Sequence, residues 1–207
     1  MTLTKLEPLD EERFALHFEE GVTLRCGPKE VLDFSLRPGL TLEGEAWEKL
    51  EDACAYWAVR RQAAEMISRR AMSAGELRRK LRDKGASPLH AEKAAAWLLD
   101  LGAIDEGAYA AMVVRHYAAR GYGKKRLEEE LYRHQVPREH WEEALAQLPD
   151  SRETLDALVR KKLHAAPMDR DGLKKLAASL ARRGYAWEEV RSAIARNVSQ
   201  EDNDFDD

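Results

Sequence analysis

The chain repeats itself at intervals of about 50 residues, and this internal repeat limits its possible folds more than any other feature. Four sets of residues align at offsets of 50 and then 49 residues. They are Leu77, Leu127 and Leu176; Leu81, Leu131 and Leu180; Ala91, Trp141 and Val190; and Ala95, Leu145 and Ile194. Gly85, Gln135 and Gly184 align in the same way. Because the offsets hold across the turns between helices, chance periodicity within one helix does not explain them.

Each repeat has the pattern of three helices joined by turns. Ser73 and Glu76 form a capping-box pattern, and Ser87-Pro88 is typical of an N-cap followed by an N1 proline. Gly85 suits the left-handed turn that ends a helix. The patterns predict helices over 56–70, 73–84 and 88–101, then 106–120, 124–135 and 137–148, and finally 152–164, 170–183 and 187–197.

The first 42 residues have a different pattern. Phe14, Leu16 and Phe18 alternate with other residues, and after a break at Gly21 the run 22–26 resumes the alternation, which predicts a hairpin. A third run, 31–36, is expected to be extended and ends at Pro38-Gly39, a turn pair. A linking helix is expected from residue 43 or 44 to near residue 53.

These patterns predict a mainly α fold in which three tandem three-helix repeats form an elongated helical array behind a small N-terminal β-hairpin element. The expected parts are 1–55 (β-element and linking helix), 56–104, 105–149 and 150–198 (the first, second and third repeats), and 199–207 (an acidic, disordered tail). One repeat alone buries little apolar surface, so neighbouring repeats share a core. Such arrays offer long surfaces and few deep pockets, which favours binding over catalysis.

Charge is distributed unevenly along the chain. The net charge is −4, but residues 1–56 hold 6 Lys and Arg against 13 Asp and Glu, residues 57–198 hold 28 against 20, and residues 199–207 hold none against 5. The basic body is therefore expected to meet a polyanion or an acidic protein surface.

Each repeat carries basic residues near the same elements, so a regular stack would align them in a discontinuous stripe. The predicted partner- and DNA-binding residues are Arg78, Arg82, Lys124, Lys125, Arg126, Lys161, Lys162, Arg182 and Arg183. Such a stripe can follow a phosphate backbone or an acidic groove on a protein filament. The alternative is that these bases only balance glutamates on exposed helices, as at Glu76 and Lys80.

No catalytic or metal-binding pattern is present in the sequence. The segment 121–125 is rich in glycine and lysine but lacks the spacing of a phosphate loop, and no pair of histidines has zinc-helix spacing. Cys26 and Cys54 are expected to be free thiols. No stretch approaches the roughly 18 to 20 apolar residues that span a bilayer, and residues 1–10 lack a secretory pattern. We therefore expect a cytoplasmic, monomeric protein that is not an enzyme and needs no cofactor.

Three segments resemble the RecX family of RecA regulators. The motif Ser73-x-x-Glu76-Leu77-x-x-Lys80-Leu81-x-x-Lys84-Gly85 is similar to the first RecX repeat, as is Ala95-x-x-Leu98-x-x-Leu101-Gly102-x-Ile104-Asp105-x-x-x-Tyr109-Ala110. Arg120-Gly121-Tyr122-Gly123-x-x-Arg126-Leu127-x-x-Glu130-Leu131 is similar to the second repeat. Lys161-Lys162, Leu176, Leu180, Arg183-Gly184-Tyr185 and Ile194 resemble the third, which departs from the family pattern at 165–168.

The resemblance covers about residues 57–197. It implies a cytoplasmic bacterial regulator that binds RecA nucleoprotein filaments, and single- and double-stranded DNA, and that modulates recombination, DNA repair and the SOS response, usually by inhibition. It implies no cofactor and no catalysis. Two alternatives stay open on the residues alone: a DNA-binding module without preference for RecA, and a helical scaffold for another protein.

Overall fold

The structure is a computed structural model that describes residues 1–148, 151–164 and 169–204. The chain forms two compact units, residues 1–104 and 105–207. The first contains the N-terminal β-element and the first repeat, and the second contains the second and third repeats. The predicted mainly α fold with a small N-terminal β-element is confirmed.

The β-element is a three-stranded antiparallel sheet in the order β1-β2-β3, with strands Leu3–Asp10, Arg13–Phe18 and Thr23–Cys26. The predicted hairpin is β2 and β3, in which Phe14 pairs with Cys26 and His17 with Thr23. The sequence pattern did not single out β1, because Lys5, Glu7 and Pro8 interrupt its apolar alternation. Charged residues and proline are typical of an edge strand, which is the position that β1 occupies.

The segment 31–36 is not extended, so the prediction of a third strand there was wrong. Its first part belongs to helix α1, Pro28–Asp33. Pro28 supplies the fixed backbone angle of a first helical position, and the backbone N–H of Gly27 donates to the Glu30 carboxylate at 3.0 Å. These local helix-start signals outweigh the β-propensity of Val31 and Phe34.

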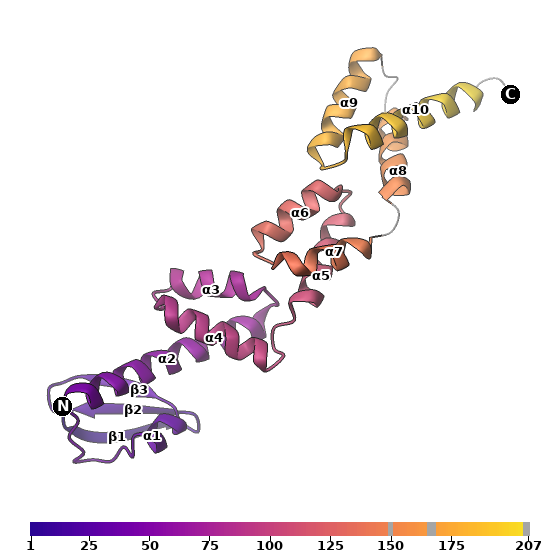
Figure 1. Cartoon of the computed structure of the whole chain (residues 1–207). Helices are drawn as coiled ribbons and strands as arrows, with labels where there is room; N and C mark the ends of the chain where they lie inside the picture. The colour runs from indigo at the N-terminus through magenta and orange to yellow at the C-terminus, as the bar shows by residue number, and fades with distance from the viewer. Residues whose placement is uncertain (149–150, 165–168, 205–207) are drawn as a thin grey trace. The chain divides into compact units, whose positions relative to one another are not determined.

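Helix α2, Gly44–Arg69, is continuous, so the prediction of two helices separated near residue 55 was also wrong. No glycine or proline lies between Glu45 and Arg69 to end a helix. The N-terminal half of α2 packs on the sheet, where Leu50 and Cys54 join the core, and its C-terminal half packs on α3 and α4 (Figure 1). One helix therefore serves both the β-element and the first repeat.

The two cysteines lie in this core on different elements. Cys26 ends β3 and Cys54 lies in α2; both are free and buried. A hydrogen bond with Cys26, together with burial, raises the pKa of the Cys54 thiol.

The first repeat is completed by α3, Ala74–Asp83, and α4, Pro88–Asp100. The predicted caps are present: the hydroxyl of Ser73 accepts from the backbone N–H of Glu76 at 2.9 Å, and that of Ser87 accepts from His90 at 3.1 Å.

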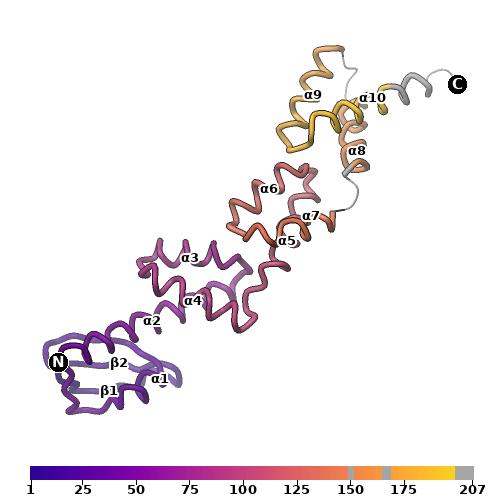
Figure 2. Tube along the Cα trace, viewed as in Figure 1, coloured from indigo at the N-terminus to yellow at the C-terminus, as the bar shows by residue number. Residues whose placement is uncertain are grey.

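The second unit contains two more three-helix groups. The second repeat consists of α5 (Glu106–Ala118), α6 (Lys124–Arg133), the 3-10 turn η1 (Arg138–His140) and α7 (Trp141–Ala146). The third consists of α8 (Ser151–Leu163), α9 (Arg170–Arg182) and α10 (Trp187–Asp204). Helix α5 packs on α6 and α7, and α10 packs on α8 and α9 (Figure 2). Helix α10 extends into the acidic segment 199–207, of which 205–207 lie outside the described residues, as does the departure from the family pattern at 165–168.

Positions that align in sequence have the same structural role. The six aligned leucines are all buried, namely Leu77, Leu81, Leu127, Leu131, Leu176 and Leu180. Gly85, Gln135 and Gly184 each follow the middle helix of a repeat, with φ of 94°, 54° and 92°. Left-handed backbone at all three turns confirms the alignment of the repeats.

Candidate partner-binding surface

In the first repeat, the two predicted binding residues differ in their surroundings. Arg78 is half-buried, and its guanidinium donates to Glu92 of α4 at 2.6 Å. Arg82 is exposed and makes no ion pair within the described part of the chain. Arg78 therefore has a structural role that sequence reasoning did not assign, whereas Arg82 remains available to a partner.

The second and third repeats meet where helix α6 begins and α9 ends. The backbone N–H of Gly123 donates to the carbonyl of Arg183 at 2.8 Å, and that of Lys125 donates to the carbonyl of Gly184 at 3.1 Å. The first amides of a helix and the last carbonyls of another lack partners within their own helices. Here these groups satisfy each other, and the positive end of one helix dipole faces the negative end of the other.

This contact requires glycine on both sides. A Cβ on Gly123 would lie 2.6 Å from the carbonyl carbon and oxygen of Gly184, and a Cβ on Gly184 would lie closer still to the backbone nitrogen of Arg126. Real Cβ atoms do not approach backbone this closely, so neither position accepts a side chain without separating the two turns.

The contact gathers basic residues from both repeats, which we name the junction cluster. It comprises Arg120, Lys124, Lys125, Arg126, Arg182 and Arg183. Five of the nine predicted binding residues are therefore brought together, and Arg120 was not among those nine. Arg120 joins them because its carbonyl accepts a hydrogen bond from the Arg183 guanidinium at 3.3 Å. These hydrogen bonds join the turn before α6 to the turn after α9, which are about 60 residues apart in the sequence. An alignment of the repeats does not reveal such a contact.

Most of the junction cluster lacks carboxylate partners. Lys124, Lys125, Arg182 and Arg183 are exposed, and none of them forms an ion pair with any residue the structure describes. Neighbouring like charges repel one another, and an anionic partner relieves that repulsion. The cluster is therefore suited to bind phosphates or carboxylates.

Arg126 is the exception within the junction cluster, because it has carboxylate partners. Its side chain is 31% exposed and pairs with Glu129 at 2.7 Å and with Glu130 at 2.8 Å. Glu130 is buried and lies 3.3 Å from Arg133 as well. Arg126 therefore stabilises a buried carboxylate and has less freedom to bind a partner than the two lysines.

Lys161 and Lys162 are exposed near the end of α8. No described contact joins them to the junction cluster. The structure therefore presents them as a separate basic pair on the third repeat.

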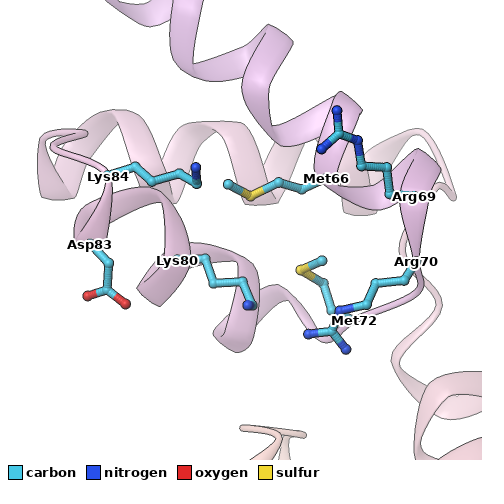
Figure 3. Close-up of a pocket in the computed structure, with 7 residues that line it drawn as sticks. All are labelled: Met66, Arg69, Arg70, Met72, Lys80, Asp83 and Lys84. Carbon is cyan, nitrogen blue, oxygen red and sulfur yellow. The ribbon is translucent and has the colours of Figure 1, made fainter.

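A further basic site surrounds two methionines in the first repeat (Figure 3). A pocket of about 460 Å³ is lined by Met66 and Met72 with four cationic side chains and Asp83. Figure 3 shows Lys80 and Lys84 reaching from α3 toward the methionines. Two cations of this pocket are already engaged, since Arg70 pairs with the buried Glu76 and Lys80 lies 3.7 Å from the same carboxylate. Sequence reasoning missed this pocket because its methionines come from α2 and from the loop after it.

The described residues contain neither a cluster of metal-binding side chains nor a membrane-spanning helix. No group of three or more His, Cys, Asp or Glu side chains in the described part of the chain is arranged to hold a metal ion. No helix among them is both long and apolar enough to cross a membrane.

Tandem three-helix repeats with a basic cluster at a repeat junction define the chain as a helical-repeat protein with a cationic surface. Two family models match its second unit: residues 105–145 match the second three-helix domain of RecX, and residues 150–194 match the third. The chain is 35% identical over 130 residues to the regulatory protein RecX of Pseudomonas savastanoi pv. phaseolicola, which covers 62% of this chain and 84% of that protein. It is 36% identical over 134 residues to the regulatory protein RecX of Xanthomonas citri, covering 64% and 83%. The chain belongs to the RecX family of regulatory proteins.

Solved structures agree on the fold. A crystal structure of a regulatory protein RecX superposes with a TM-score of 0.74 at 18% identity, covering 94% of this chain and 98% of the other. RecX from Lactobacillus salivarius gives a TM-score of 0.61 at 20% identity, covering 69% and 96%.

Proposed function

We propose that this chain is a cytoplasmic, monomeric and non-enzymatic regulator that binds RecA nucleoprotein filaments on DNA and inhibits their recombinase and ATPase activities, and with them the SOS response. Membership of the RecX family supports the regulatory role. The observation that carries the proposal is the junction cluster, where exposed cations with no carboxylate partner among the described residues are held together by backbone hydrogen bonds. The proposal also includes three exposed bases outside the junction cluster: Arg82 of the first repeat, and Lys161 and Lys162 of the third.

The test compares two pairs of lysines in the second unit. Lys124→Glu with Lys125→Glu reverses two exposed charges in the junction cluster. Lys174→Glu with Lys175→Glu is the matched control, because it makes the same change at an adjacent exposed pair in α9 outside the cluster. Each variant is titrated into RecA-catalysed, single-strand-dependent ATP hydrolysis over a range of salt concentrations.

We expect the junction variant alone to need about tenfold more protein for half-inhibition. Its affinity should also depend less on salt, by about 0.7 to 0.9 log units per log unit of salt for each phosphate that the variant no longer neutralises. Equal inhibition by wild type and both variants would contradict the proposal and leave these lysines as solvated surface.

A DNA-binding module without preference for RecA is the second candidate, because unpaired lysines also suit bare phosphates. A gel shift on naked DNA, performed beside the ATPase assay, separates the two. Inhibition at concentrations that shift no naked DNA favours filament binding. Inhibition that always follows occupancy of naked DNA favours the alternative.

A further inference from the structure

A second pocket lies within the first unit and shares no lining residue with the pocket around Met66 and Met72. It measures about 380 Å³ and lies where the β-element, α2 and α4 meet. Glu12 and Pro28 line it from the β-element, Trp57, Arg60 and Arg61 from α2, and Trp97 from α4. We name it the arginine–tryptophan pocket. Small-molecule sites in proteins begin at about 300 Å³, so its size fits a single small ligand.

Arg60 lies in this pocket and has no anionic partner among the residues that the structure describes. Its guanidinium carbon lies 4.6 Å from the ring centre of Trp97 and 6.0 Å from that of Tyr56. Its Nε atom is buried and has no hydrogen-bond acceptor among the described residues. A buried donor without an acceptor destabilises the fold, and the neighbouring aromatic rings attract the charge without accepting this N–H as a carboxylate or phosphate would. An anionic acceptor is what this side chain lacks.

Arg61 repeats the arrangement on the neighbouring tryptophan. Its guanidinium carbon lies 5.9 Å from the ring centre of Trp57, and it makes no ion pair in the part of the chain that the structure describes. The Trp57 indole is held by the turn before α1, since a Cβ on Gly27 would lie 2.5 Å from the indole nitrogen. The backbone of Gly27 therefore fixes this ring in place before any ligand binds.

The chemistry of the pocket selects a ligand that is both flat and anionic. Two half-buried indoles offer faces for stacking, Arg60 offers a buried donor without an acceptor among the described residues, and Arg61 offers an exposed guanidinium. Of the residues that line the pocket, Glu12 alone bears a carboxylate, which opposes an anion and leaves the arginines in excess. Aromatic rings interleaved with arginine are typical of sites that stack a base and hold its phosphate.

We propose that the arginine–tryptophan pocket binds one nucleotide unit, with the base on an indole and the phosphate on Arg60 and Arg61. The unit comes either from a free nucleotide or from single-stranded nucleic acid. The inference goes beyond the proposed function and is independent of it, because the pocket shares no residue with the junction cluster.

Tryptophan fluorescence of the full chain tests the proposal. The probes are a short oligothymidylate, thymidine 5′-monophosphate, an abasic oligonucleotide of the same length and inorganic phosphate. We expect quenching by a thymine-bearing probe, at an affinity about tenfold or more above that of the matching probe without a base. Quenching by the monophosphate identifies a free nucleotide as sufficient, and quenching by the oligonucleotide alone identifies the single strand as the source.

Variants then assign the quenching to this pocket. Arg61→Gln removes an exposed charge and should weaken binding about tenfold, whereas Glu12→Gln should strengthen it. Lys49→Gln is the control, because Lys49 is an exposed base of the same helix that pairs with Glu45 at 2.7 Å. Trp57→Phe with Trp97→Phe should abolish the quenching signal while keeping aromatic rings in the fold.

Three outcomes would overturn the proposal: no quenching by any thymine-bearing probe, equal affinity for the thymine-bearing and abasic strands, or wild-type binding by Arg61→Gln. The Lys124→Glu and Lys125→Glu chain separates this result from the proposed function. It should inhibit the filament about tenfold more weakly and keep the pocket's quenching at the wild-type level, so that either proposal can fail without the other.

Discussion

At the scale of single residues, the first and second repeats contain the same ion pair with its charges exchanged. In the first repeat a buried glutamate, Glu76, lies four residues before Lys80. At the aligned positions of the second repeat, Arg126 lies four residues before the buried Glu130. The pair thus keeps its place on the middle helix while the buried acid changes position, which indicates that these two repeats need a neutralised buried acid there rather than a particular residue at either position.

Arg126→Gln should lower the free energy of unfolding by about 1 to 3 kcal/mol. Removing one partner from a fully buried pair destabilises by about 3 to 5 kcal/mol. The loss should be smaller here because Glu130 keeps Arg133 at 3.3 Å and Arg126 is 31% exposed. Urea melts of Arg126→Gln, Glu130→Gln and the double variant measure the coupling between the two side chains. Additive losses would show that the pair contributes nothing.

At the scale of helices and strands, the sequence predicts best where local chemistry and packing agree. The middle helices were predictable because Ser73, Leu77 and Leu81 give a cap and a single apolar stripe, and the structure uses both. The prediction of a strand over 31–36 was wrong because Gly27, Pro28 and Glu30 start a helix just before this apolar run, and these local contacts outweigh its β-propensity. The prediction of a break inside α2 was wrong because a change in the apolar pattern was taken for a helix end. The pattern changes there because the helix passes from the core of the β-element to that of the first repeat, and no glycine or proline interrupts its backbone.

The aligned leucines of the middle helices should be equally important in all three repeats. Leu81, Leu131 and Leu180 are 0%, 0% and 3% exposed. Truncation to alanine should therefore lower the free energy of unfolding by about 2 to 5 kcal/mol at each site. Leu89→Ala is the control, because Leu89 is 57% exposed and surface substitutions usually stay within about 0.5 kcal/mol. Urea melts with losses below about 1 kcal/mol at two of the three buried sites would show that the repeats do not share one core design.

At the scale of the whole molecule, the basic surface depends on contacts between repeats as well as on the bases that each repeat carries. The sequence showed that the middle helices and their ends carry bases, and helical periodicity predicts that many of them face solvent. It did not show which bases meet, because that depends on Gly123 and Gly184 bringing two turns into backbone contact. It also did not show that Arg78 pairs with Glu92 and Arg126 with Glu130. The spacing of charged residues along the sequence does not tell an arginine that forms an ion pair from one that is free in solvent.

Gly123 offers a clean test of whether the junction of the second and third repeats matters for function. Its φ is −83°, which alanine adopts without strain, so a substitution there acts only through the missing space beside Gly184. Gly123→Ala should push the turns apart, break the hydrogen bonds to Arg183 and Gly184, and disperse the junction cluster. The helices of each repeat should survive, because the core of the third repeat is built from its own three helices.

Hydrogen exchange of the Lys125 amide reports the junction directly, and we expect its protection to fall at least tenfold in Gly123→Ala while the amides inside α6 and α9 keep theirs. Filament ATPase inhibition should weaken about as much as in the lysine reversal, although no charge has changed. Gly107→Ala is the matched control, because the nearest atom to a Cβ at this helical glycine lies 3.5 Å away and alanine favours helix. If Lys125 loses protection and inhibition stays at the wild-type level, then the lysines act singly and their assembly across the junction is irrelevant to binding. If inhibition falls together with protection, the backbone contact between two glycine turns is itself part of the regulatory surface.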